Sequence, residues 1–385
     1  MFLSLPKVNF IGKIPESFSY LTSLHYLDMR SCNLSGPIIK PLWNLSHIQS
    51  LNLGNNHLEG PISQFFKFGN LKLLSLGINN FDGQLDFLSS NRSWTQLEVF
   101  ELSKNNLSGQ IASAICSLKA LTVLDLGSNN LKGTIPRCLG EISGLRVFDL
   151  SNNNLSGAIN TAFSIGNTLR VINLHGNKLE GAGNLFVHLR IIDLSSNGFS
   201  GNLPMSLFEN LKAMKIIDEI TRNPQYVGED LYYYYFYSEM ITTKGLDLEF
   251  RGVLTANIVI NLSKNRFEGC IPSSIGDLIA LRTLNLFHNG LEGKQFDTFE
   301  NSSNQGNDGL CGLPLSKDCG DDEGVSQAIT PFGLDQGEEG DSTMISWQEV
   351  LMGYGCGLII GLSDYYENEK TQEKILVCNL ARYST

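Results

Sequence analysis

A fixed period of 24 residues constrains this chain more than any other feature. Each unit places apolar residues at set positions and follows them with an asparagine. Between residues 121 and 135 these positions are held by Leu121, Leu124, Leu126, Asn129, Leu131, Gly133 and Ile135. They recur 24 positions later as Leu145, Phe148, Leu150, Asn153, Leu155, Gly157 and Ile159. Self-similarity of this length predicts a solenoid in which each unit packs on its neighbours.

The spacing inside one unit predicts its local structure. Leu124 and Leu126 alternate with residues that point the other way, so each unit should open with a short strand. Strands of successive units would stack about 4.8 Å apart. The predicted fold class is therefore an α/β-type repeat solenoid, a leucine-rich repeat horseshoe. It would carry a parallel sheet on its concave side and short 3-10 or irregular segments outside.

One asparagine per unit falls at the tight turn after the strand. Its amide both donates and accepts, so a column of these side chains can satisfy backbone groups of neighbouring turns. Such groups would cost about 1–3 kcal/mol each if they were buried unpaired. The column consists of Cys32, Asn56, Asn79, Asn105, Asn129, Asn153, Asn177, Asn197, Asn265 and Asn289. Cys32 is accordingly predicted to be a buried thiol.

Composition excludes several function classes. The formal net charge of −11 argues against a nucleic-acid-binding protein, which needs a basic surface for phosphates. No phosphate-binding loop, zinc-protease motif or kinase signature occurs, and the six histidines are scattered. The expectation is a binding protein without enzyme activity, metal or cofactor.

Outward positions of the predicted strands form columns that a ligand could contact. An apolar column contains Val99, Val123, Val147, Val171 and Ile191, and an acidic one contains Glu101, Asp125, Asp149, Asn173 and Asp193. Together they would suit an extended peptide or a basic protein loop. Alternatively, the columns only reflect repetition, because these residues are common in the repeat. Departures from the pattern are then the better specificity candidates: Tyr26, Arg30, Leu73, His175 and Phe287.

Cysteines and glycosylation acceptors favour an extracellular chain. Cys116 and Cys138 lie on the outer side of adjacent turns, where a disulfide is geometrically plausible, whereas Cys270 has no obvious partner. Acceptor sequences occur at Asn33, Asn44, Asn91, Asn106, Asn154, Asn261 and Asn301. A glycan on Asn261 would obstruct the concave face. Residues 1–7 show no secretory signal, an absence that a missing N-terminal segment would explain.

The consensus Leu-x-x-Leu-x-Leu-x-x-Asn-x-Leu-x-Gly-x-Ile-Pro resembles the plant extracellular form of the repeat. Residues 294–301, with 306–315 and Cys319, are similar to the C-terminal cap of plant receptor-like proteins, especially the Cf class of disease-resistance receptors. The resemblance implies a Cys311–Cys319 disulfide in that cap. It also implies a loop-out segment before the last repeats, where the period stops and the aromatic run 231–237 occurs.

The resulting organisation has seven parts. They are repeats over 1–205, with the first incomplete, an island segment over 206–256, repeats over 257–293, a cap over 294–320, an acidic spacer over 321–346, a shortened transmembrane-like segment over 347–363 and a tail over 364–385. The interval from Asn177 to Asn197 is short. The chain therefore resembles a truncated or degenerate copy of the family.

The segment before the tail resembles the family's single transmembrane helix. Gly353, Gly357 and Gly361 have the small-residue spacing that lets membrane helices approach closely. However, the uncharged stretch from Val350 to Ser363 reaches only about 21 Å of a hydrocarbon core of about 30 Å. Resemblance predicts a single-pass plasma-membrane location with extracellular repeats. A helix too short to span would leave the chain secreted or unanchored.

The resemblance implies a receptor-like protein without a kinase. Its repeats would recognise an extracellular pathogen- or self-derived peptide, protein or glycan, and it would signal in plant defence through a partner receptor kinase. One alternative is a secreted inhibitor of fungal cell-wall-degrading enzymes. Another is a non-functional receptor fragment, whose first repeat would leave the edge of the core open.

Overall fold

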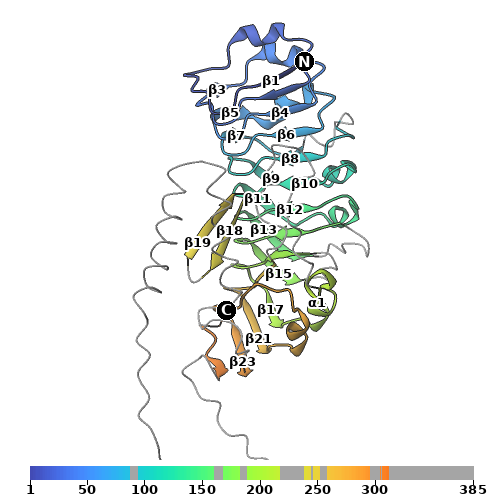
Figure 1. Ribbon diagram of the computed structural model, residues 1–385, viewed down its shortest axis with the longest axis vertical. Helices are drawn as coiled ribbons and strands as arrows, with labels where there is room; N and C mark the ends of the chain where they lie inside the picture. Colours follow the sequence, from blue (N-terminus) through green and yellow to red (C-terminus); the bar gives the residue numbers. More distant parts are fainter. Residues whose placement is uncertain are drawn as a thin grey trace, which may run out of the picture. The chain divides into compact units, whose positions relative to one another are not determined.

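The computed structural model describes residues 1–86, 94–159, 168–182, 189–216, 238–243, 246–251, 258–294, 304 and 306–311. All of them belong to one compact unit, Met1–Asp321. Within these residues the strand that opens each repeat pairs in parallel with the next, as predicted, and the strands form one 11-stranded sheet (Figure 1). Its strands, in spatial order, are β1 (Phe2–Ser4), β2 (Tyr26–Asp28), β4 (Ser50–Asn52), β6 (Leu73–Ser75), β8 (Val99–Glu101), β10 (Val123–Asp125), β12 (Val147–Asp149), β14 (Val171–Asn173), β16 (Ile191–Asp193), β20 (Val259–Asn261) and β22 (Thr283–Asn285).

Shorter parallel sheets run beside the long one, after the asparagine turn of each repeat. The first contains β3 (Ser35–Pro37), β5 (His57–Pro61) and β7 (Asn80–Asp82). The second contains β9 (Ser108–Gln110), β11 (Asn130–Gly133), β13 (Asn154–Ile159) and β15 (Lys178–Ala182). The third contains β17 (Ser200–Asn202), β21 (Arg266–Cys270), β23 (Gly290–Lys294) and β24 (Gly309–Cys311). Between the second and third lies the short interval from Asn177 to Asn197.

The outer side of the solenoid is made of short helical turns, as the sequence predicted. The 3-10 turns are η1 (Glu16–Tyr20), η2 (Lys40–Asn44), η3 (Ile62–Lys67), η5 (Ser113–Ser117), η6 (Arg137–Glu141), η7 (Lys212–Met214) and η8 (Ser273–Asp277), and α1 (Met205–Glu209) is a short α-helix. Proline precedes several of these turns, as Pro136 does at η6 and Pro272 at η8, with φ near −60°. Its fixed φ favours the start of a helical turn.

The leucines of the repeat fill one continuous core between the long sheet and the outer turns. Leu121, Leu124 and Leu126 are completely buried, and most of their equivalents are buried too, whereas Leu3 and Leu281 in the first and last strand-bearing repeats are only partly buried. Burial of a leucine side chain contributes about 1.5–3 kcal/mol, so the periodic leucines supply most of the driving force for stacking. The core extends through Leu207, Phe208 and Met214. The repeat therefore continues past residue 206, where the sequence had placed the start of the island segment.

The asparagine column works as predicted. The Nδ2 of Asn129 donates to the carbonyl oxygens of Leu102, Leu126 and Gly127 at 3.0–3.2 Å, and its Oδ1 accepts from the N–H of Leu107 at 3.0 Å. One amide thus joins two consecutive repeats. Cys32 takes this position in the second repeat, where its buried thiol donates to the carbonyl of Leu5.

The cap adds one more step to the same column. Asn307 accepts from the N–H of Leu291 and donates to the carbonyl of Leu286, which are the bonds that a repeat asparagine makes. Leu310 beside it is buried in the core. The period does not predict this step, because Asn307 follows Asn289 after only 18 residues.

The insertion does not interrupt the long sheet. Strands β16 and β20 pair directly, with Ile192 opposite Ile260, although 68 residues separate these positions in the sequence. Within the insertion, β18 (Ser238–Thr243) and β19 (Leu246–Arg251) form an antiparallel hairpin. The aromatic run 231–237 lies outside the described residues.

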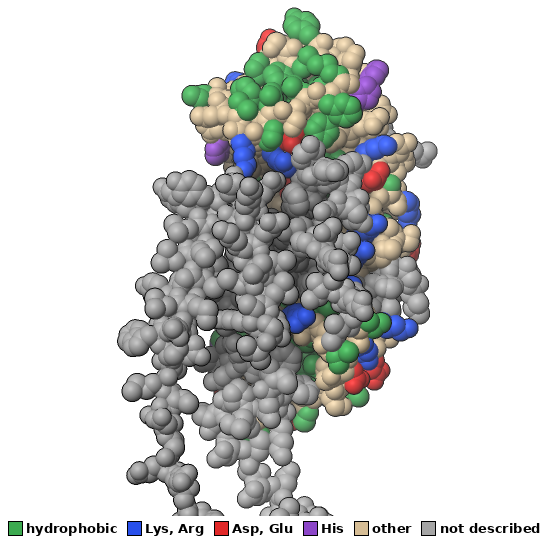
Figure 2. Space-filling model, viewed as in Figure 1, with side chains coloured by type: hydrophobic (Ala, Val, Ile, Leu, Met, Phe, Trp, Pro, Cys, Tyr) green, Lys and Arg blue, Asp and Glu red, His purple; other side chains and the backbone are tan. Residues whose placement is uncertain are grey.

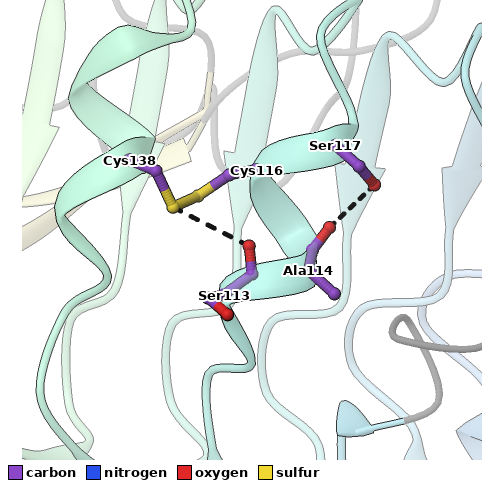
Figure 3. Close-up of a disulfide and its surroundings, with 5 residues drawn as sticks. All are labelled: Ser113, Ala114, Cys116, Ser117 and Cys138. Carbon is purple, nitrogen blue, oxygen red and sulfur yellow. Dashed lines mark hydrogen bonds between the residues drawn. A yellow bond between two sulfur atoms is a disulfide. The ribbon is translucent and has the colours of Figure 1, made fainter.

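The predicted disulfide between Cys116 and Cys138 is present and joins η5 to η6 on the outer side (Figure 3). The hydroxyl of Ser117 donates to the carbonyl of Ala114 within η5. Cys311 is disulfide-bonded, and its predicted partner Cys319 lies outside the described residues. Cys270 is a free, exposed thiol.

The end of the sheet that carries β1 exposes an apolar surface. Figure 2 shows hydrophobic side chains gathered over this end of the solenoid. Those with large exposed fractions are Met1, Phe2, Val8, Ile11 and Tyr20, and Ile11 is 90% exposed. These exposed apolar side chains all belong to the first repeat and the outer turn that follows it.

Candidate ligand-binding surface

Each strand of the long sheet turns two side chains away from the leucine core. On β10 these are Val123 and Asp125, which flank the buried Leu124. Parallel pairing without a register shift sets Val123 opposite Val99 and Val147, and Asp125 opposite Glu101 and Asp149. The two predicted columns therefore exist on the concave face as continuous rows.

The apolar row is buried. Its members form a hydrophobic cluster separate from the leucine core, and none is more than 5% exposed: Leu73, Val99, Val123, Val147, Val171, Ile191 and Val259. Tyr26 lies in the same row, half-buried, at the N-terminal end of the sheet. A ligand would therefore meet the side chains that flank this row rather than the valines that the sequence proposed. Val259 is a member that the sequence analysis did not include.

Glu101 is held by four hydrogen bonds. Its Oε2 accepts from the hydroxyl of Ser75 at 2.8 Å and from the N–H of Gly77 at 3.0 Å. Its Oε1 accepts from the N–H and the hydroxyl of Ser103 at 3.1 and 2.6 Å. A Cβ on Gly77 would overlap the Glu101 carboxylate, so the glycine provides the space that the longer acid needs.

Asp125 lies between two other acids of the row. It accepts a hydrogen bond from the N–H of Gly127 at 3.1 Å, and carboxylates flank it on both sides. Burial raises its pKa well above the usual value, and the neighbouring charges of Asp149 and Glu101 raise it further. Burial and the neighbouring carboxylates thus both disfavour the ionised form of Asp125, while the Gly127 hydrogen bond and Lys104 act in the opposite direction.

Amides separate the acids in the second half of the row. Asn173 donates to Asp149 at 3.1 Å, and Asn261 donates to Asp193 at 2.9 Å. Ser195 donates its backbone N–H and its hydroxyl to Asp193, and His175 Nδ1 lies 2.7 Å from the Ser195 hydroxyl. Burial raises the pKa of Asp193, while His175 and these donors act in the opposite direction.

This His–Ser–Asp contact does not have the order of a hydrolase triad. The serine hydroxyl donates to the aspartate, so the histidine cannot take that proton through the same bond. The three side chains form a structural hydrogen-bonded chain. Among the residues that the structure describes, no group of three or more His, Cys, Asp or Glu side chains could hold a metal ion.

The remaining specificity candidates share one position, two residues after the acidic row. Arg30, His175 and Phe287 all lie there and are half-buried. Arg30 is 3.6 Å from the carboxylate of Asp28, and the Phe287 ring packs edge-on against His288. Smaller residues, such as Gly127 and Ser151, fill the position in other repeats. Arg30, His175 and Phe287 therefore distinguish the repeats in which they occur.

A row on the other side of the valines was missed by the sequence analysis. Arg146, Arg170 and Arg190 each precede the first residue of their strand, and all three are half-buried. The signal was available, because all three fall at the same position of consecutive repeats.

The described glycosylation acceptors differ in access. Asn33, Asn44, Asn106 and Asn154 are exposed, whereas Asn261 is 4% exposed. The Nδ2 of Asn261, where a glycan would attach, instead donates to Asp193 and Ser195. The folded structure does not accommodate the glycan predicted at Asn261. Asn91 and Asn301 lie outside the described residues.

Among the described residues, none of the helices combines the length and apolar character that crossing a bilayer requires. The glycines predicted to mediate helix packing, Gly353, Gly357 and Gly361, lie outside that part of the chain. So do the acidic spacer, the transmembrane-like segment and the tail.

Comparison with known families defines the class. Leucine-rich repeat models match residues 120–179 and, as single repeats, 23–45, 47–68, 96–118, 188–210, 258–278 and 280–302. Among solved structures, the ectodomain of the Arabidopsis thaliana receptor kinase GASSHO1/SCHENGEN3, in complex with CASPARIAN STRIP INTEGRITY FACTOR 2, matches with a TM-score of 0.55 and 27% identity. The match covers 83% of this chain and 31% of that one. The fold is a leucine-rich repeat solenoid like those of plant receptor ectodomains.

The relatives by sequence are plant receptors. Receptor-like protein 9DC3 of Solanum pimpinellifolium is 47% identical over 49% of this chain and 28% of its own length. Receptor-like protein 53 of Arabidopsis thaliana is 29% identical over 92% of this chain and 37% of its own length. The chain belongs to the leucine-rich repeat proteins and is related to the plant receptor-like proteins of the Cf-9 kind, and it spans about a third of the length of these relatives. The family is non-enzymatic, which confirms the expectation that this chain is not an enzyme.

Proposed function

We propose that this protein acts at the plant cell surface as the ligand-recognising part of a defence receptor. Its concave sheet would bind an extracellular peptide, protein or glycan of pathogen or self origin, and the signal would pass to a partner receptor kinase. The observation that carries the proposal is the regular concave surface of a Cf-9 relative, on which three of the repeats carry distinctive side chains.

The half-buried side chains beside the rows support recognition there. Arg30, His175 and Phe287 differ in charge and shape, and each follows a strand of the same sheet by two residues, which sets them at the same position of their repeats. A preorganised surface loses little entropy when a ligand binds, which favours affinity. The GASSHO1/SCHENGEN3 ectodomain, whose structure was solved with a bound factor, has the same architecture.

The test compares concave and outer-side variants of the full chain expressed in leaf cells. Cells would be challenged with peptide and glycan fractions from a pathogen, and the defence response would be measured. We expect His175→Ala and Phe287→Ala to reduce the response at least about tenfold, as loss of a contact worth about 1.4 kcal/mol does. The exposed Lys119→Ala, on the outer side, should leave it unchanged. An equal loss in all three variants would contradict recognition by the concave face.

Membrane attachment and the partner kinase need separate measurements. Carbonate washing of the membrane fraction should leave the full chain in the pellet, and co-precipitation should recover a receptor kinase with it. A chain released by carbonate and recovered from the extracellular fluid would instead support the secreted inhibitor. In that case, inhibition of fungal cell-wall-degrading enzymes becomes the next assay.

A further inference from the structure

Arg146, Arg170 and Arg190 lie side by side on three adjacent strands. The N–H of Arg170 donates to the carbonyl of Arg146 at 2.8 Å, and the N–H of Arg190 donates to the carbonyl of Arg170 at 2.8 Å. The backbone therefore sets the three residues about 4.8 Å apart along the solenoid axis. We call these three residues the arginine row.

Three like charges in register stand out in a chain whose net charge is −11. At the same position the neighbouring repeats carry Thr122 on one side and Ile258 on the other. The acids on the same three strands lie beyond the buried valine row, and Asp149 and Asp193 accept hydrogen bonds from Asn173 and Asn261. Positive charge is thus concentrated on one border of the apolar row.

The chemistry of arginine selects the ligand class. A guanidinium stays charged at all relevant pH values and offers five N–H donors, of which a carboxylate engages two in parallel. An arginine that already has one contact in the protein can therefore still bind a carboxylate. Lysine would supply the charge without the paired geometry.

We propose that the arginine row is a carboxylate-binding subsite for an acidic peptide ligand. The proposal rests on the proposed function, and it states which chemical group of the ligand the concave face binds. The ligand carries two acidic residues that pair with Arg146 and Arg190, while Arg170 lies between them.

The spacing of the row predicts the spacing in the ligand. Arg146 and Arg190 are separated by two strand intervals, which is about 9.6 Å. In a polyproline-type extended peptide, residues i and i+3 lie on the same side about 9.3 Å apart. A fully extended strand instead places residues i and i+2 on the same side, at about 6.7 Å. The preferred ligand therefore has acidic residues three positions apart in a polyproline-type segment.

A peptide fits these observations better than an acidic polysaccharide. The row contains only three arginines, and the described residues Thr122 and Ile258 bound it at both ends. A polyuronate has a carboxylate on every sugar and would gain most from a longer basic stripe. The row instead matches a short ligand with a few placed charges.

The test measures binding of short synthetic proline-rich peptides to the purified full chain. One peptide carries glutamates at i and i+3, a second carries them at i and i+2, and a third has glutamine at i and i+3. We expect the first peptide to bind at least about tenfold more tightly than the glutamine peptide, since hydrogen bonds between two charged groups are stronger than those to a neutral amide. The i and i+2 peptide should fall between them.

Protein variants assign the effect to the row. Arg146→Gln and Arg190→Gln should each weaken the i and i+3 peptide at least about tenfold and leave the glutamine peptide unaffected. Arg146→Lys should recover only part of the affinity, because the charge remains but the paired geometry is lost. Arg282→Gln is the matched control, since Arg282 is exposed and occupies the same position in the repeat of β22.

Several results would overturn the proposal. These are equal binding of the glutamate and glutamine peptides, no binding of any peptide, an equal loss in Arg282→Gln, or binding of oligogalacturonate with the same dependence on Arg146 and Arg190. If the row fails in this way while His175→Ala and Phe287→Ala still reduce the cellular response, the receptor function stands without it. If those concave variants also have no effect, the proposed function fails as well.

Discussion

The acidic row of the concave sheet is built in two different ways along its length. From β8 to β12 three carboxylates occupy adjacent strands, whereas from β14 to β22 Asp193 lies between Asn173 and Asn261. In the second stretch Asn173 and Asn261 each donate to the acid one strand before them. In the first stretch, the residue on the strand after Asp125 is another acid, Asp149, so it offers no donor. Burial and the neighbouring charges raise the pKa of Asp125.

The difference shows two ways in which a repeat solenoid accommodates a charged residue that recurs at the same position in consecutive repeats. In-register stacking repeats whatever a position carries, so a row of acids accumulates like charge. The chain relieves this either by alternating amides with acids or by a glycine that makes room for a longer acid, as Gly77 does for Glu101. The asparagine column escapes the problem, because an amide both donates and accepts.

The largest expected effect comes from breaking the asparagine column. Asn129→Ala removes an acceptor for Leu107 N–H and a donor to three carbonyls, all in the interior. We expect a loss of about 3 kcal/mol or more in the free energy of unfolding, measured with denaturant. Asn130→Ala, its exposed neighbour, is the control and should change little. Equal effects would mean that the amide is not the stabilising group.

Filling the space at Gly77 should break the first stretch of the acidic row. The added Cβ of Gly77→Ala would displace the Glu101 carboxylate from its four hydrogen bonds. The expected loss is about 2 kcal/mol in unfolding free energy. Gly54→Ala is the matched control, because its Cβ would meet its neighbours only at ordinary contact distances of 3.4–3.6 Å. If the two variants prove equally stable, the glycine has no such role.

Making the second stretch resemble the first should destabilise it. Asn261→Asp loses the donor to Asp193 and sets two carboxylates on adjacent strands. We expect a loss of about 1–2 kcal/mol at neutral pH that shrinks in acid, as the carboxylates protonate. Asn285→Asp, one strand further, has an amide before it instead of an acid and should lose less. Thermal unfolding of both variants at several pH values would show a loss independent of pH if charge were not the cause.

The converse change should relieve the first stretch. Because its folded pKa is raised, Asp125 stabilises the fold only at low pH, and this contribution is lost as the pH rises through the folded value. Asp125→Asn removes that loss and offers a donor to Glu101, so it should stabilise the protein on the order of 1 kcal/mol at neutral pH. The gain should grow between acid and neutral pH, whereas exposed Asp82→Asn should show no such trend. A stability difference that is the same at every pH would contradict unfavourable ionisation of Asp125.

Much of this structure followed from the period alone. The strands, the asparagine column, the outer turns and the Cys116–Cys138 disulfide were predictable, because in-register stacking converts equal sequence position into spatial contact. Prediction failed where the period breaks. Met214 belongs to a repeat although residue 206 was expected to end it, and Asn307 joins the column at an irregular interval.

The candidate binding surface was less predictable than the scaffold. Its rows were correctly aligned from sequence, but the burial of Val123 and Val147 was not foreseen, nor was the hydrogen-bonded environment that excludes a glycan from Asn261. The exposed fraction of a side chain depends on all the residues that surround it. A periodic pattern predicts only which residues of adjacent repeats lie beside it.

By itself, the sequence determined the leucine-rich repeat solenoid and which residues lie in each row, since both follow from a repeat length that stacking preserves. Only the tertiary structure decided that the valine row is buried, that Glu101 accepts four hydrogen bonds while burial raises the pKa of Asp125, and that β16 pairs with β20 across the insertion. These outcomes depend on desolvation, on distances between charges and on contacts between residues far apart in the chain. None of these is encoded in a period of 24 residues.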